Sequence, residues 1–248
     1  MLHKGRLVYL DLHKTGSTFL VRFLNDEVRG TLQHFVKHQP GALNRKVAGQ
    51  VWVMSVRDPI SYYVSLWSYG AKSQRGPWRA FEDSTRDRLY DSSNPDAFRD
   101  WLAHLAAGKG LAKNAAGQVD NAHGKSIARS AELGCGLYTL RLLTMATAAP
   151  LLKEPDRVLG DTPTEDLASW YSEHTRVDEI VRLENLIPDL TRVLSRPELQ
   201  LRAGALERLA KSRPQNESKH EDPRSYYDEE SLALVRERDH LIFELFYT

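Results

Sequence analysis

The sequence predicts an α/β fold of three layers, with helices on both faces of a central, mainly parallel sheet. Two short apolar runs, Leu7–Leu12 and Val51–Val56, and a third candidate strand, Glu179–Leu183, carry this prediction. The apolar runs lack helical periodicity, which is typical of strands covered on both faces. Each run leads into a segment with helical spacing, and strands that alternate with helices build parallel sheets with right-handed crossovers.

The helices that follow these runs have their own start signals. Apolar residues spaced for one helix face fill Phe19–Val28. The second helix should begin at Asp58-Pro59, because aspartate caps exposed amides and proline suits the first helical turn. The third should form near Pro188, and Asp228–Phe246 should form a strong C-terminal helix.

Residues 70–126 differ from the rest of the chain, because they are polar and rich in Arg, Asp, Gly and Ser. We interpret them as an insertion in a single domain over residues 1–248. Residues 108–125 contain four glycines and few apolar residues, which predicts a mobile loop. Further helices are expected at Phe98–Leu105, capped by Asn94, at Tyr138–Ala149 and at Leu199–Ala210.

The composition excludes several classes of protein. The formal net charge is +1, so no overall field indicates a nucleic-acid partner or an anionic membrane surface. Cys135 is the single cysteine, which rules out an intrachain disulfide and suggests a buried, inert thiol. No apolar run approaches the ~18 residues of a membrane span, so we expect a soluble, most simply cytoplasmic protein. No His, Cys and carboxylate cluster has metal-ligand spacing, so no metal is expected.

The turn after the first strand has the composition of an anion site. It reads His13-Lys14-Thr15-Gly16-Ser17-Thr18, which offers a positive charge, a close backbone approach at the glycine, and three hydroxyls. The free amides and the dipole of a helix N-terminus also attract anions. The alternative is an ordinary strand–helix turn in which Ser17 or Thr18 caps the helix. A Walker A loop is disfavoured, because here the lysine precedes the glycine.

Tyr9–Leu20 resembles the 5′-phosphosulfate loop of the sulfotransferases that use 3′-phosphoadenosine 5′-phosphosulfate (PAPS). A second element, Arg57-Asp58-Pro59 with Ser65 eight residues after the arginine, resembles their 3′-phosphate element. An arginine fork suits bidentate phosphate binding, although Arg57 could instead form a local ion pair with Asp58. The resemblance implies the P-loop-like strand–loop–helix of a sulfotransferase-type fold. It implies these donor-binding residues: His13, Lys14, Thr15, Gly16, Ser17, Thr18, Arg57 and Ser65.

Other segments carry the resemblance less specifically. Gly136–Thr139, Arg182–Leu186 and Tyr226–Tyr247 are similar to segments of bacterial and Golgi-type carbohydrate sulfotransferases. Asn216–His220 resembles the loop that closes over the cofactor in such enzymes. A cofactor role for Lys219 and a solvated loop lysine are both open.

The resemblance implies in-line transfer of a sulfuryl group from PAPS to a hydroxyl acceptor, a carbohydrate or another small molecule. The product would be adenosine 3′,5′-bisphosphate. Lys14 is the expected catalytic cation, which would neutralise charge on the sulfuryl group and the departing oxygen. A general base with a pKa near neutrality would assist, and we select His38. His34, His13 and an acidic residue are the alternatives, and His38 could also be a surface histidine.

Two other functions fit part of the pattern. A P-loop-type small-molecule kinase is disfavoured by the missing Walker A order and by the 3′-phosphate element. A non-catalytic nucleotide-binding protein is disfavoured by the intact Lys14 and the available histidines. The acceptor and the oligomeric state cannot be deduced from the sequence. Tyr69, Trp78 and Arg79 are candidate acceptor contacts in or beside residues 70–126, and the two aromatic residues could equally be core anchors.

Overall fold

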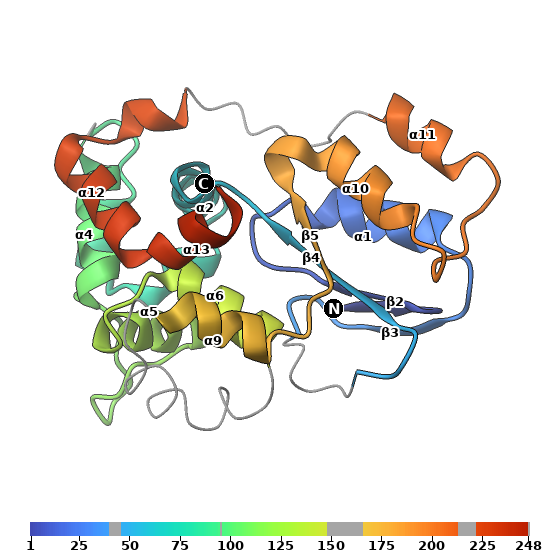
Figure 1. Cartoon of the computed structure of the whole chain (residues 1–248). Helices are drawn as coiled ribbons and strands as arrows, with labels where there is room; N and C mark the ends of the chain where they lie inside the picture. Colours follow the sequence, from blue (N-terminus) through green and yellow to red (C-terminus); the bar gives the residue numbers. More distant parts are fainter. Residues whose placement is uncertain (40–45, 95, 148–165, 213–221, 248) are drawn as a thin grey trace. The chain divides into compact units, whose positions relative to one another are not determined.

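The computed structural model describes residues 1–39, 46–94, 96–147, 166–212 and 222–247 (Figure 1). The chain forms two compact units. The first comprises residues 1–58 and 141–217, and the second comprises residues 59–140 and 218–248. The polar segment 70–126 therefore belongs entirely to the second unit.

A five-stranded mixed sheet organises the first unit. Its order is β3-β1-β2-β4-β5, in which β2, β4 and β5 run parallel and β1 is antiparallel to both of its neighbours. The α/β class and the three predicted strands are confirmed, but the sheet is less parallel than expected. The strands are β1 (Leu2–Lys4), β2 (Leu7–Leu10), β3 (Leu32–Phe35), β4 (Val51–Val56) and β5 (Glu179–Arg182).

The two antiparallel pairings come from strands that have no long apolar run. β1 is three residues long, and β3 is an edge strand of mixed polarity, Leu-Gln-His-Phe, with mostly exposed side chains. An edge strand needs to bury little apolar surface, so the criterion that identified the central strands does not apply to it.

The parallel register brings the carboxyl ends of β2, β4 and β5, where the chain leaves the sheet, to the same edge. Leu10 of β2 pairs with Met54 of β4, and Val56 of β4 pairs with Arg182 of β5. Parallel strands end at the same edge of a sheet. Residues 11–16, 57–58 and 183–185 therefore leave the sheet on one side.

One face of this sheet packs against helices of the same unit. Side chains of alternating strand residues, such as Leu7, Tyr9, Val51 and Val53, are buried in one core with apolar residues of α1 and α10. The helices predicted after the first and third strands are thus confirmed, whereas the one predicted over 199–210 begins only at Ala205. The helices of this unit are α1 (Ser17–Glu27), α9 (Leu167–His174), the 3₁₀ helix η4 (Leu183–Asn185), α10 (Leu186–Leu194) and α11 (Ala205–Lys211).

The second unit is helical in the part that the structure describes. Its elements are α2 (Pro59–Ser73), η2 (Gly76–Ala80), α3 (Asp83–Leu89), α4 (Ala97–Ala107), α5 (Ala122–Glu132), η5 (Pro223–Tyr226), α12 (Glu229–Arg238) and α13 (His240–Phe246). α6 (Leu137–Ala146) begins in this unit and ends in the first. No described helix has the length and apolar character needed to cross a membrane.

The polar segment contains more helix than its composition predicts. α5 begins at Ala122, inside the predicted loop, because the side chain of Asn121 caps it by accepting from the amide of Gly124 at 2.9 Å. The N-cap residue of α4 is Asp96, whose side chain makes no cap, while the side chain of Asn94 accepts from the Asp96 amide at 3.0 Å. The predicted C-terminal helix is divided in two at Asp239.

Asp239 is fully buried and joins three segments of the second unit. One carboxylate oxygen accepts from the Tyr63 hydroxyl at 2.7 Å, and the other accepts from the amide and hydroxyl of Thr139 at 2.8 Å each. Burial raises the pKa of Asp239 above its usual value. Gly136 makes room for this carboxylate, since a Cβ there would lie 2.1 Å from one of its oxygens.

We predict that Gly136→Ala destabilises the protein by at least about 2 kcal/mol, because the buried carboxylate of Asp239 can move away only by giving up its hydrogen bonds to Tyr63 and Thr139. Gly134→Ala is the matched control, since its φ is +68° but its Cβ would meet only one atom, at 4.0 Å. The control should lose only about 1 kcal/mol, from the left-handed backbone conformation. Urea unfolding of both variants measures the difference, and equal losses would contradict the packing argument.

Candidate anion-binding site

The loop after β2 leaves its amides open at the start of α1. Gly16 is the N-cap residue of α1, with a φ of +81° and no side-chain cap. Within the described part of the chain, the amides of Ser17 and Thr18 donate no hydrogen bond. Neither hydroxyl caps the helix, so these donors remain directed at the space in front of it.

The loop has two left-handed residues, Lys14 at φ +62° and Gly16 at φ +81°. A non-glycine residue in this region is uncommon and costs conformational energy. At Gly16 the loop also passes close to the exit of β5, because a Cβ there would lie 2.7 Å from the side chain of Leu183. The glycine is therefore required both by backbone conformation and by contact with the neighbouring strand exit.

A chain of buried hydroxyls supports the loop from inside the protein. Thr15, which is fully buried, donates to the carbonyl of Leu12 at 2.9 Å and lies 2.7 Å from the Ser55 hydroxyl. Ser55 lies 2.7 Å from the hydroxyl of Tyr9. Because Thr15 has only one proton to donate, Ser55 donates to Thr15, and Tyr9 donates to Ser55. The predicted donor-binding hydroxyl of Thr15 thus serves the loop itself and fastens it to β2 and β4.

Positive charge gathers at this edge of the sheet. Partial burial, together with the charges of Arg57 and Lys37, lowers the pKa of Lys14 from 10.5 to about 8. Lys14 and Arg57 are half-buried, whereas Lys37 is exposed. Like charges held together in a region of reduced solvation favour the binding of an anion.

The second and third strand exits are joined to each other. The amide of Asp58 donates to the Glu184 carboxylate at 2.9 Å, which ties the residue after Arg57 to η4. Arg182, the last residue of β5, donates through its amide and its Nε to Asp189 at 3.0 and 3.1 Å. These bonds fix the backbone where the chain leaves β4 and β5, beside the loop after β2.

His38, the predicted base, lies in the segment after β3 and contacts the loop after β2. Its amide donates to both carboxylate oxygens of Asp11 at 3.0 Å, and its Nδ1 lies 2.7 Å from the main-chain oxygen of Asp11. Its ring stacks on the imidazole of His13 with 3.6 Å between centroids. His34, an alternative base, contacts the side chain of Gln39 instead.

The structure thus brings together most of the predicted site and leaves part of it apart. The first unit contains His13–Thr18, His38 and Arg57. These residues lie at one edge of the sheet, except that the buried side chain of Thr15 points into the protein and supports the loop. Ser65 lies on α2 in the second unit and is 5% exposed, so its pairing with Arg57 stays a prediction. The Asn216–His220 loop and Lys219 lie outside the described residues.

Several residues of the site were not identified from the sequence. Asp11 and Ser55 lie within strand-like runs, where a polar side chain reads as an irregularity. Lys37 adds positive charge to the site, although the segment around it has no recognisable motif. Only the proximity of its sequence neighbour His38 to the loop could have pointed to it.

The acceptor candidates have mixed surroundings. Tyr69 is exposed, whereas the ring of Trp78 lies against the guanidinium of Arg86, 3.9 Å from the ring centroid. That contact occupies one face of the Trp78 ring within the second unit. Arg79 has an exposed side chain.

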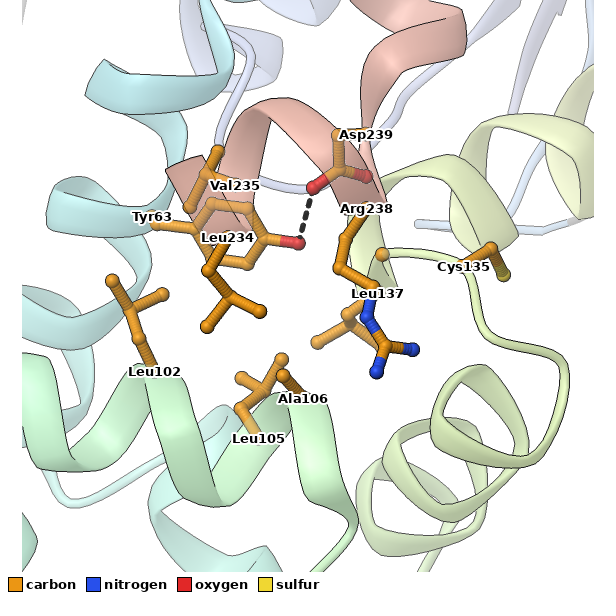
Figure 2. Close-up of a pocket in the computed structure, with 11 residues that line it drawn as sticks. Tyr63, Leu102, Leu105, Ala106, Cys135, Leu137, Leu234, Val235, Arg238 and Asp239 are labelled. Atoms are coloured by element: carbon orange, nitrogen blue, oxygen red, sulfur yellow. Dashed lines mark hydrogen bonds between the residues drawn. The ribbon is translucent and has the colours of Figure 1, made fainter. Parts of the chain in front are cut away.

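The second unit also holds a small cavity beside Asp239 (Figure 2). Its volume is about 20 Å³, room for one or two water molecules and not for a sugar or nucleotide. Cys135 lies at its wall, and burial raises the pKa of this thiol to about 12, so it remains protonated and inert. Among the described residues, no three His, Cys, Asp or Glu side chains gather as metal ligands. The loop after β2 is therefore the better candidate for chemistry.

We predict that Thr15→Val destabilises the protein by about 1–3 kcal/mol, because it leaves the buried Leu12 carbonyl and the Ser55 hydroxyl without their partner. Tyr9→Phe removes only the last donor in the series of buried hydroxyls, and this variant should lose about 1 kcal/mol of stability. Thr18→Val, at an exposed position, is the control and should stay within about 0.5 kcal/mol of the parent. Chemical denaturation ranks the three variants, and a Thr15→Val protein as stable as the control would refute the hydroxyl chain.

We also predict that Lys14→Met stabilises the protein by about 1–2 kcal/mol at pH 7. The pKa of Lys14 is lower in the folded than in the unfolded state, so folding disfavours its charged form. This penalty is fully present below about pH 8 and disappears as the pH rises towards 10.5. Melting temperatures from pH 6 to 10.5 should therefore converge at the alkaline end. Lys125→Met, an exposed control on α5, should show no such trend.

No protein-family model matches the chain, and comparison with curated proteins and with solved structures gives no match either. The site itself therefore supplies the support for a function.

Proposed function

We propose that the protein is a PAPS-dependent O-sulfotransferase with the three-layer, P-loop-like fold of that family. The observation that carries the proposal is the uncapped start of α1, where the open amides of Ser17 and Thr18 lie in the same loop as the half-buried Lys14. The lowered pKa of Lys14 reflects its burial near Arg57 and Lys37. The repulsion between these positive charges destabilises the ligand-free protein, and a bound anion with several negative charges would relieve it. A donor with a phosphosulfate and a separate phosphate has that character.

The residues of the cradle divide between the two ends of such a donor. The amides of Gly16, Ser17 and Thr18 would bind the 5′-phosphate, and the buried Thr15 would hold them in place. Arg57, together with Ser65, would bind the 3′-phosphate, which ATP lacks. His13, which begins the loop, completes the proposed donor-binding set.

The donor supplies a sulfuryl group on a good leaving group. In the transfer the acceptor oxygen forms a bond to sulfur, and the bond from sulfur to the bridging phosphate oxygen breaks. Lys14 would stabilise the charge that develops on that departing oxygen. His38 would take the proton from the acceptor hydroxyl, a carbohydrate or another small molecule. The products are the sulfated acceptor and adenosine 3′,5′-bisphosphate.

Calorimetric titration with adenosine 3′,5′-bisphosphate, ATP and AMP tests the donor class. We expect the bisphosphate to bind most tightly. Arg57→Ala should weaken its binding by about 10- to 100-fold, the effect of losing charge-assisted hydrogen bonds to one phosphate, while the weaker binding of AMP stays nearly the same. Preference for ATP would favour the kinase alternative. Tight bisphosphate binding without turnover on any acceptor would favour a non-catalytic binding protein.

The pH dependence of kcat/KM tests the two catalytic assignments, because this ratio reports groups of the free enzyme. We predict a bell-shaped profile. Activity rises as His38 loses its proton below about pH 6.5 and falls as Lys14 loses its proton near pH 8. Release of adenosine 3′,5′-bisphosphate with a panel of hydroxyl acceptors provides the rate.

Lys14→Arg is the diagnostic variant for the alkaline limb. Arginine keeps its charge throughout this pH range, so the variant should be slower but should keep its remaining activity above pH 8. An unchanged alkaline limb in Lys14→Arg would assign that limb to another group.

A further inference from the structure

Asp11 holds His38 at two points. The carboxylate of Asp11 accepts from the His38 amide, and its main-chain oxygen lies 2.7 Å from the Nδ1 of the His38 ring. These contacts keep His38 in the left-handed conformation, at φ +57°. Because Asp11 directly follows β2, they also attach His38 to the first residues of the donor loop.

The contact at Nδ1 decides which ring nitrogen is basic. A carbonyl oxygen only accepts, so Nδ1 of His38 must carry a proton. In the neutral ring the lone pair then lies on Nε2. The carboxylate oxygen nearest to Nδ1 is 3.5 Å away, too far for a good hydrogen bond.

The ring of His13 covers one face of this imidazole. The two rings are nearly parallel, with an interplanar angle of 18° and 3.6 Å between centroids. The side chain of His38 is only 24% exposed. The stack fixes the plane of the ring and the hydrogen bond at Nδ1 fixes its orientation in that plane, so together they fix the direction of Nε2.

We propose that His13 is a positioning residue for His38, whose stacked ring holds the neutral, Nε2-basic form of His38 in place to accept a proton. This inference rests on the proposed function for its catalytic part, but the stacked and neutral state of His38 is a property of the free protein. His13 acts through its ring face and excludes water from one side of His38.

The charged groups around the pair act on the protonation of His38 in opposite directions. Lys37 and the amino group of Met1 disfavour a proton on His38, the carboxylate of Asp11 favours one, and Lys14 follows His13 in the loop. Burial is the largest influence and lowers the pKa of His38. Two cationic rings in a stack would repel each other, which also disfavours a charged ring at His38.

The test compares His13→Ala with His13→Phe. Alanine removes the stacked ring, whereas phenylalanine keeps an aromatic ring and removes only the nitrogens. We expect kcat to fall about tenfold or more in His13→Ala, as a misplaced base predicts, and to recover substantially in His13→Phe. Equal losses in the two variants would overturn the proposal and indicate that His13 acts through its nitrogens.

Nitrogen NMR of the His38 imidazole in the free protein provides a readout that does not depend on turnover. The Nε2 lone pair should be observed in the parent and in His13→Phe. The pKa of His38 should rise towards 6.5 in His13→Ala, because water reaches the ring, and should remain low in His13→Phe. An identical titration in all three proteins would show that the rings do not stack. The expected NMR result without sulfuryl transfer would instead reject the proposed function and retain the positioned histidine.

Discussion

The parallel register of β2, β4 and β5 is the constraint on which the rest of the site depends. It brings three chain exits to one edge of the sheet, so that Gly16 packs on Leu183 and the amide of Asp58 meets Glu184. The hydroxyl chain from Tyr9 through Ser55 to Thr15 then fastens the loop to two of these strands. A loop held in this way can keep an unfavourable backbone conformation at Lys14, because the surrounding structure determines it.

The same arrangement sets stability against binding. A partly buried ammonium near two other cations weakens the fold, and the lowered pKa of Lys14 is the measure of that loss. Proteins often retain such destabilising groups where activity requires them. Here the compensating interactions are close by, in the buried hydroxyls beneath the loop and in the apolar core shared by β2, β4, α1 and α10.

The sequence predicts the parts of this design that repeat or that bury apolar surface. Nearly continuous apolar runs mark β2 and β4, a shorter apolar pair between charged residues marks β5, and the composition of the loop after β2 predicts an anion site. The edge strand β3 lacks that signal because its side chains remain exposed. The inward direction of the Thr15 hydroxyl and the division of the C-terminal helix at Asp239 depend on partners 40 and 176 residues away, Ser55 and Tyr63. Local patterns do not encode such contacts.

The atoms that Asp11 offers to His38 orient its imidazole beside the cationic loop. A carboxylate on Nδ1 would favour the charged imidazolium and raise its pKa. Asp11 instead directs its carboxylate to the amide of His38 and its main-chain oxygen to the ring. Both Asp11 contacts still favour a proton on the ring, but burial is the larger influence and, together with Lys37, lowers the pKa of His38. Near neutral pH, Lys14 can thus stay charged while His38, on the neighbouring segment after β3, stays neutral.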